Sequence, residues 1–177
     1  MRQLDECIAM MDEGIARVRN ALPEMPATEV ALARLLLLVG GGMQEELERK
    51  LKPVKLNDSE FLTMMVLFSQ PDGSSTPSEL CIYTSQGATN MTRIANALVK
   101  RGLIVRGPSK EDRRRVSIRI TPAGRRLVQQ MLPPMFPRLR AQFAGFSAAE
   151  ARNLGRLLRK LAHNLDQLDL DQPDPDA

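Results

Sequence analysis

Basic residues are concentrated between Arg93 and Arg126. This segment contains eleven lysine and arginine residues and only two acidic ones, so it carries a charge of +9. The whole chain carries +4, which leaves −5 for the remaining residues. Such a segment is suited to bind a polyanion, or it forms a solvated basic face. Charge alone does not separate these two interpretations.

Side chains that can read DNA bases lie at the start of this segment and just before it. Glutamine and asparagine can each form two hydrogen bonds with adenine, arginine can reach guanine or a phosphate, and a threonine methyl can contact thymine. The candidate base-reading residues are Gln86, Ala88, Thr89, Asn90, Thr92 and Arg93. Threonine, asparagine and glutamine also occur at exposed helix starts simply as caps, so this stretch does not establish DNA binding by itself.

A loop over residues 107–115 gathers four cations, and a fold gains nothing from holding them together unless an anion binds there. Arginine favours the negative potential of a narrow minor groove. We expect Asp112 to brace this loop by pairing with a neighbouring arginine rather than by contacting DNA. The candidate DNA-binding residues of the loop are Lys110, Arg113, Arg114 and Arg115.

Residues suited to catalysis or metal binding are sparse. The chain has a single histidine, His163, and two cysteines, Cys7 and Cys81, that form no Cys-x-x-Cys pair. These residues supply neither a catalytic triad nor a set of metal ligands. We therefore expect no enzyme, no metal and no cofactor, although carboxylate-only chemistry stays open.

The N-terminal region is acidic where a signal peptide needs an apolar run. The longest apolar stretch, residues 35–43, is far too short to cross a bilayer. We therefore expect a cytoplasmic protein with no membrane partner.

Apolar spacing and helix-start signals predict the elements that carry these side chains. Helices are expected over 1–22, 28–51, 58–69, 77–84 and from 88 to about 101, then strands over 103–106 and 116–120. A helix from 122, interrupted by Pro133, Pro134 and Pro137, and a last helix over 147–168 complete the order. Helix, turn, helix and basic hairpin follow one another as in a winged helix-turn-helix. The predicted fold class is mainly α with a small β-hairpin wing.

The two ends of the chain carry long apolar helix faces that a small winged domain cannot cover, which predicts a homodimer. We expect dimerisation helices over 1–51, a DNA-binding lobe over 52–124, further dimerisation helices over 125–168 and a disordered acidic tail over 169–177. Inside the second helix, Gly40, Gly41 and Gly42 predict a kink or a close helix contact.

Several short motifs resemble the MarR family of bacterial transcription regulators. They are Thr76-Pro-Ser-Glu-Leu80, Thr89-Asn-Met-Thr-Arg-Ile94, Leu98-Val-Lys-Arg-Gly-Leu103, Asp112-Arg-Arg-Arg-Val116 and Thr121-Pro-x-Gly124. The Leu132-Pro-Pro134 step and the long N-terminal extension resemble its EmrR/MprA-like branch, whose members repress multidrug efflux operons.

The resemblance implies a homodimer that binds a pseudo-palindromic operator in double-stranded DNA. It also implies that Arg114 enters the minor groove and that a small aromatic or phenolic effector relieves repression. Ala88 departs from the family, because relatives often have a basic residue there, so their operator sequences do not transfer to this chain.

An effector pocket is the part of this interpretation that depends most on the resemblance. Candidate lining residues, with Arg34 as an anion anchor, are Arg34, Met43, Phe61, Met64, Met65 and Phe68. Plain core packing is the alternative for each of the apolar ones. Two other functions stay open: redox sensing through Cys7, although acidic neighbours oppose its activation, and a helical interaction protein without specific DNA readout.

Overall fold

A computed structural model describes residues 4–108 and 116–170, with side chains up to residue 168. The candidate wing residues Lys110, Asp112, Arg113, Arg114 and Arg115 lie outside the described residues, as do tail residues 171–177. The chain divides into two compact units, Met1–Gln129 and Gln130–Ala177. We describe each unit by itself.

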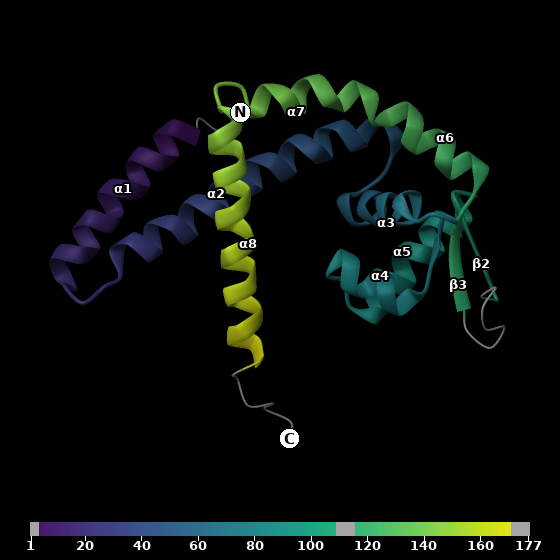
Figure 1. The fold of residues 1–177 in the computed structure, drawn as a ribbon, viewed down its shortest axis with the longest axis horizontal. Coiled ribbons are helices and arrows are strands. Elements are labelled where there is room, and N and C mark those ends of the chain that lie inside the picture. The colour runs from purple at the N-terminus through teal and green to yellow at the C-terminus, as the bar shows by residue number, and fades with distance from the viewer. Residues whose placement is uncertain (1–3, 109–115, 171–177) are drawn as a thin grey trace. The chain divides into compact units, whose positions relative to one another are not determined.

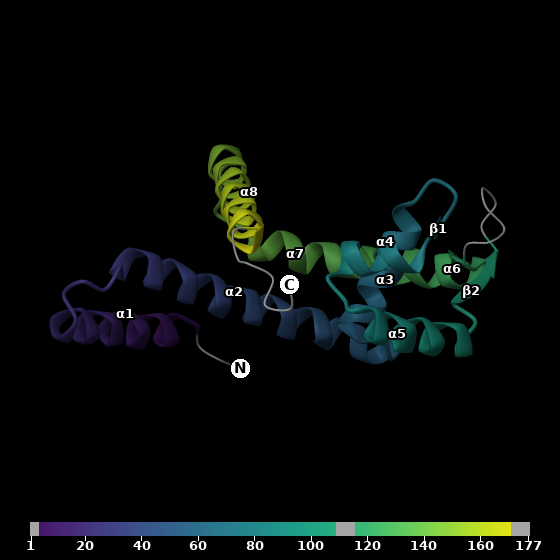
Figure 2. The same cartoon turned by 90° about the horizontal axis from the view of Figure 1, so that it is seen from below.

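Two long helices form the first part of unit one: α1 (Leu4–Ala21) and α2 (Ala27–Leu51) lie side by side, as both views show (Figures 1 and 2). The three glycines do not interrupt α2, and the chain stays α-helical through them. The alternative of a close helix contact is confirmed at Gly42, where a Cβ would lie 3.3 Å from Leu4 Cδ1. A short 3-10 turn, η1 (Lys52–Val54), ends this part.

Three shorter helices follow: α3 (Asp58–Ser69), α4 (Pro77–Thr84) and α5 (Ala88–Lys100). Side chains fix where two of them begin. Asn57 and Glu60 form a reciprocal capping box at α3, and Thr76 and Glu79 form another at α4. Each box satisfies backbone N–H groups that the first helical turn leaves free, which explains why both starts were predictable.

A three-stranded antiparallel sheet packs beside these helices, with strand order β1-β3-β2. The hairpin strands are β2 (Ile104–Pro108) and β3 (Val116–Ile120), paired from Ile104 with Ile120 to Pro108 with Val116. The two-residue β1 (Ser74–Ser75), which we did not predict, pairs with Arg119 and Ile118 on the other edge of β3. Strand β2 also extends two residues beyond its predicted end.

The core of unit one lies between α3, α4, α5 and the sheet, the cluster of elements seen in Figure 1. Its members are fully buried and come from six elements and the end of α2: Leu51, Met64, Leu67, Leu80, Met91, Ile94, Leu98, Ile104, Ile118 and Val128. Helix α6 (Pro122–Met131) contributes Val128. This core holds the helix-turn-helix and the root of the hairpin as one body.

Unit two begins near the end of α6 and contains the predicted proline interruption. A 3-10 turn, η2 (Pro133–Met135), separates α6 from α7 (Phe136–Gln142) because proline lacks the backbone donor that a helix needs. Helix α8 (Ala148–Leu170) follows and runs two residues past its predicted end. Its leucines at 157, 158, 161, 165 and 168 are all exposed. None of the helices in the described ranges is long and apolar enough to cross a membrane.

Candidate nucleic-acid interface

Helix α5 separates an apolar buried face from a polar one. Met91, Ile94, Ala95 and Leu98 are at most 2% exposed, as predicted. Its polar face carries the candidate base-reading residues: Ala88, Thr89, Thr92 and Arg93 are exposed, whereas Asn90 and the preceding Gln86 are half-buried. The structure therefore brings all six candidates together, with Gln86 in the turn before α5 and the other five along its first two turns.

The turn before α5 fixes the direction in which the helix starts. Ser85 adopts the left-handed conformation, with φ of 50°, and its N–H donates to the carbonyl oxygens at the end of α4. The Gln86 N–H donates to the Cys81 oxygen over 3.0 Å. The buried Thr84 hydroxyl donates to the Leu80 oxygen over 2.6 Å. These bonds satisfy the last carbonyls of α4 and hold the turn in one geometry.

Three polar side chains at the start of α5 are hydrogen-bonded to one another. Arg93 donates to Asn90 Oδ1 through Nε over 3.2 Å and through Nη2 over 2.8 Å. The Asn90 amide nitrogen donates to Gln86 Oε1, and the Gln86 amide nitrogen donates to the Thr84 carbonyl oxygen over 3.3 Å. The spacing of four and three residues places the three side chains on one helical edge.

Arg106 attaches the hairpin to α5. Its Nη2 donates to the Thr92 carbonyl oxygen over 3.2 Å, so the root of β2 lies against the middle of the helix. The Thr92 hydroxyl donates back to the Ala88 oxygen over 3.0 Å and is engaged within the helix. We did not assign a positioning role to Arg106 from the sequence.

A second arginine, Arg101, attaches the end of α5 to the end of η1. Nη1 donates to the Lys55 carbonyl oxygen over 2.6 Å and Nη2 donates to the Val54 oxygen over 2.8 Å. Lys55 has a φ of 53°, and its carbonyl belongs to a turn that no helix bonds can satisfy. Arg101 and Lys55 are 46 residues apart in the sequence, so no local pattern predicts their contact. The one hint in the sequence is that Arg101 lies next to Gly102, which ends the helix.

A carboxylate lies next to the sheet at Asp72. The Ser74 hydroxyl and the Ser74 N–H both donate to this carboxylate, which lowers the pKa of Asp72 below its ordinary value, and the charge of Arg119 acts in the same direction. Asp72 therefore stays ionised at neutral pH and fixes the turn that leads into β1.

An open cavity of about 610 Å³ lies between α4, α5 and the hairpin. Its lining includes Pro77, Cys81, Met91, Thr92, Arg106 and Ile118. These residues are largely apolar, with the Arg106 cation at one side. The cavity does not include any of the six residues that we predicted to line an effector pocket.

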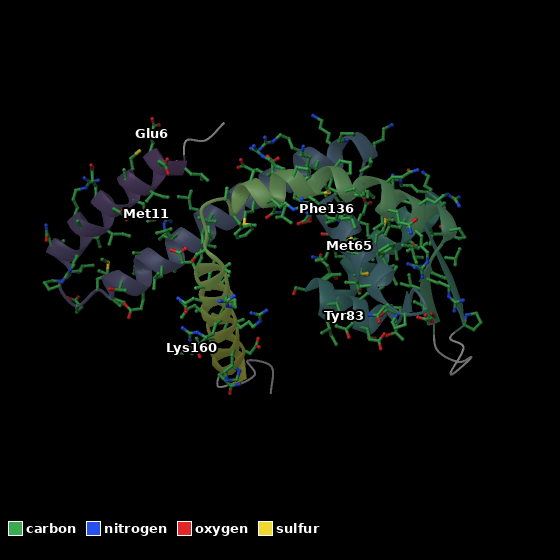
Figure 3. The ribbon with its side chains drawn as sticks, turned by 45° about the horizontal axis from the view of Figure 1, so that its top comes forward. Glu6, Met11, Met65, Tyr83, Phe136 and Lys160 are labelled. Atoms are coloured by element: carbon green, nitrogen blue, oxygen red, sulfur yellow. The ribbon has the colours of Figure 1, made fainter. Side chains whose placement is uncertain are left out.

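The predicted pocket residues occupy different environments. Met64 is fully buried in the core, and Phe61, Met65 and Phe68 are half-buried on α3. Arg34 and Met43 are exposed on α2. The Phe68 ring lies below the Arg125 guanidinium at 5.9 Å, which is a cation–π contact. Figure 3 shows Met65 on α3 and the exposed Tyr83 on α4.

Both thiols are free and half-buried, Cys7 on α1 and Cys81 on α4 beside the cavity. Across the part of the chain that the structure describes, no group of three or more histidine, cysteine or acidic side chains is arranged to hold a metal ion.

The geometry of α4, the turn and α5, followed by an antiparallel hairpin, defines a winged helix-turn-helix protein. A model of the MarR family matches residues 55–115. The transcriptional repressor MprA of Escherichia coli K12 is 34% identical over 148 residues, which cover 84% of each chain. The chain belongs to the MarR family of transcriptional regulators, whose members are not enzymes.

Solved structures share the fold. A cysteine-to-serine mutant of Escherichia coli MarR in complex with operator DNA is 24% identical, with a TM-score of 0.66, and the match covers 81% of this chain and 96% of that one. Rhodococcus jostii RHA1 CouR bound to p-coumaroyl-CoA is 21% identical, with a TM-score of 0.68, over 74% of this chain and 91% of that one.

Proposed function

We propose that the protein is a sequence-specific repressor that binds double-stranded operator DNA. The observation that carries this proposal is the outward face of α5 and of the turn before it, where the six candidate residues lie together while the opposite face of the helix is buried. In a helix-turn-helix the second helix enters the major groove and presents its N-terminal residues to the bases. The MprA relative is a repressor and the MarR structure contains operator DNA, which supports the same role here.

The hairpin completes the interface by placing cations over the DNA backbone and minor groove. The strand residue Arg106 belongs to this surface, and we propose that Lys110, Arg113, Arg114 and Arg115 extend it, with Arg114 in the minor groove and Asp112 bracing the loop. Because each phosphate contact releases counterions, the logarithm of the affinity should fall linearly with the logarithm of salt concentration.

Gel-shift titration of Arg114→Ala tests the wing assignment. The variant should lose operator binding while it keeps the wild-type circular-dichroism spectrum. Lys52→Ala is the control, because it removes one positive charge from an exposed position in η1, outside the proposed dimer helices and the candidate DNA-binding residues. Wild-type affinity of Arg114→Ala would refute a role of this arginine in binding.

We further propose a homodimer on a pseudo-palindromic operator, with residues 1–51 and 125–168 forming the dimer interface and residues 52–124 the DNA-binding lobe. The exposed leucines of α8 and the exposed Leu32, Leu36 and Leu37 of α2 support this proposal, because apolar faces of this extent are normally covered. Light scattering after size exclusion should give a mass near twice 19.7 kDa. A stable monomer would contradict the dimer.

We propose that a small aromatic or phenolic compound releases the repressor from DNA. The CouR relative binds p-coumaroyl-CoA, which supports an aromatic effector. Two locations can be separated by mutation, because Arg34 belongs to the predicted pocket and not to the observed cavity, whereas the half-buried Cys81 lines the cavity and not the predicted pocket. A thermal-shift screen of phenolic compounds, followed by gel shifts with each hit, tests both the effector class and its site.

We propose that the protein controls efflux or stress genes. The resemblance to the EmrR/MprA-like branch supports this proposal, as does the 34% identity with the repressor MprA, and we place the regulator in the cytoplasm. Selection of bound fragments from genomic DNA, followed by measurement of transcripts in a deletion strain, tests this assignment. Lower expression of the neighbouring genes in the deletion strain would indicate an activator instead.

A further inference from the structure

We propose that Asn90 does not read a base but positions Arg93, and that Arg93 reads guanine in the operator half-site. The inference rests on the proposed DNA binding and specifies which residue of α5 carries the specificity. It concerns the hydrogen-bonded residues Gln86, Asn90 and Arg93, which we call the α5 chain.

The α5 chain can exist in only one hydrogen-bonding direction. At one end, Arg93 has only donors, so it must meet the oxygen of the Asn90 amide. At the other end, the carbonyl of Thr84 has only an acceptor, so it must meet the amide nitrogen of Gln86. Between the ends, the Asn90 nitrogen therefore faces the Gln86 oxygen. Amide orientations are normally ambiguous, but these two ends decide both of them.

With the hydrogen bonds in this direction, the Asn90 oxygen is already in use, and this oxygen is the acceptor that adenine recognition requires. An asparagine reads adenine by accepting from N6 and donating to N7 at the same time. Here Asn90 Oδ1 already accepts two hydrogen bonds from Arg93. Bidentate pairing of Asn90 with adenine would break both of these bonds and release the Arg93 side chain from its place.

The groups that stay available on Arg93 are donors. Of its five N–H groups, the bonds to Asn90 use the one on Nε and one on Nη2, which leaves both on Nη1 and the second on Nη2. Guanine presents two acceptors, N7 and O6, in the major groove, and arginine pairs with both at once. Arg93 is exposed whereas Asn90 and Gln86 are half-buried, so the guanidinium is the outermost group of the chain.

Anchoring also favours readout by Arg93. A free arginine loses side-chain entropy when it meets a base, whereas a guanidinium already held by Asn90 loses less. Asn90 is itself hydrogen-bonded to Gln86, and Gln86 is hydrogen-bonded to the backbone of Thr84, whose side chain is buried at the end of α4. The core of the lobe therefore determines where the guanidinium points.

The test is a base-preference measurement with the full chain. Duplexes selected from a random pool by the wild-type protein give the half-site, and each half-site position is then replaced in turn. Arg93→Ala, Asn90→Ala and the double variant are compared at the same salt concentration. Asn96→Ala is the matched control, because Asn96 is an exposed asparagine on the same helix that takes no part in the α5 chain.

We expect Arg93→Ala and Asn90→Ala to relax the preference at the same guanine position. Loss of a bidentate arginine–guanine pair should reduce discrimination there by about 5-fold to about 150-fold. The double variant should lose no more discrimination than Arg93→Ala alone, because the two residues act through one contact. Replacing that guanine by 7-deazaguanine, which lacks N7, should weaken wild-type binding but leave Arg93→Ala binding unchanged.

Different outcomes separate this inference from the proposed function. Relaxed preference of Asn90→Ala at an A·T position, with guanine preference intact, would overturn the positioning role of Asn90. If the protein binds DNA selectively but Arg93→Ala leaves the preference for guanine unchanged at every half-site position, Arg93 does not read guanine. Binding without any sequence preference, by contrast, would overturn the proposed function itself.

Discussion

Gly124 should tolerate no side chain, and Gly124→Ala is the sharpest test of how the lobe is held together. A Cβ at this position would lie 2.3 Å from the Leu103 carbonyl oxygen and 2.8 Å from Ile120 Cγ1. The carbonyl oxygen cannot withdraw freely, because it also accepts the Thr121 N–H over 3.0 Å. Helix α6 therefore has to move away from the start of β2.

The magnitude follows from two opposing effects. Overpacking of this kind costs about 3 kcal/mol, at the upper end of its usual range, because backbone atoms make the contact. Alanine recovers about 1 kcal/mol by restricting the unfolded chain and favouring the helix. The free energy of unfolding should therefore fall by about 2 kcal/mol, which lowers the melting temperature by about 4 to 8 °C for a chain of this length.

Thermal unfolding followed by circular dichroism, at one fixed protein concentration, measures this difference. Gly41→Ala is the matched control: Gly41 also lies in a helix, but a Cβ there would meet no atom within 4 Å. It should melt at the wild-type temperature or above. If Gly124→Ala melts at as high a temperature as this control, α6 does not pack as closely against the Leu103 carbonyl oxygen as the structure indicates.

Two further changes probe other contacts of the lobe. Arg101→Ala removes two charge-assisted hydrogen bonds to loop carbonyls, so urea unfolding should report a loss of about 1 kcal/mol after allowance for solvent exposure, and Arg101→Lys should recover only part of it. An unchanged urea midpoint in Arg101→Ala would contradict this. The folded-state pKa of Asp72 is lowered, so its contribution to stability is present above the unfolded value of about 3.9 and is lost as pH falls through the folded one. Melting temperatures of Asp72→Asn should consequently decline less than those of the wild type on acidification below about pH 4, and parallel declines would refute the contribution.

Helix boundaries were predictable where local side chains determine them. The starts of α3 and α4 depend on capping residues three positions apart, which are visible in the sequence itself. The same holds for the Thr121 start of α6: the Gly124 N–H donates to the Thr121 hydroxyl over 3.0 Å. The motif Thr-x-x-Gly thus combines a cap with the close approach described above.

Features that depend on distant segments were not predictable. Strand β1 has two serines and no strand-forming pattern, and it exists because the edge of β3 offers backbone partners. The cavity takes its lining from four separate elements, so no stretch of sequence encodes it. Of the two alternatives expected at the glycines, the close helix contact at Gly42 depends on Leu4 of a different helix, and α2 continues through all three glycines because a helix can contain glycine at a modest cost.

The candidate site was also predictable in part: the positions of its residues follow from the sequence, but the hydrogen bonds among them do not. Spacing along the sequence placed the base-reading candidates on one face of α5, and the structure agrees. The interpretation of Asn90 as an adenine reader treated each side chain separately, whereas the hydrogen bonds among neighbours change what each one offers. Spacing of three and four residues is a signal that could have raised this possibility.

The number of paired strands changes along the hairpin. Beside Ile118 and Arg119, strand β3 has a neighbour on each edge, whereas beside Val116 and Ser117 it has only β2. A ribbon of two strands twists and bends far more easily than a sheet of three. Within the described residues, the three-stranded part at Ile118 and Arg119 is therefore the stiffer base of the hairpin, and the two-stranded part at Val116 and Ser117 bends more easily. Lengthening β1 by one residue pair would extend the three-stranded base to Ser117 and shorten the two-stranded part of the hairpin.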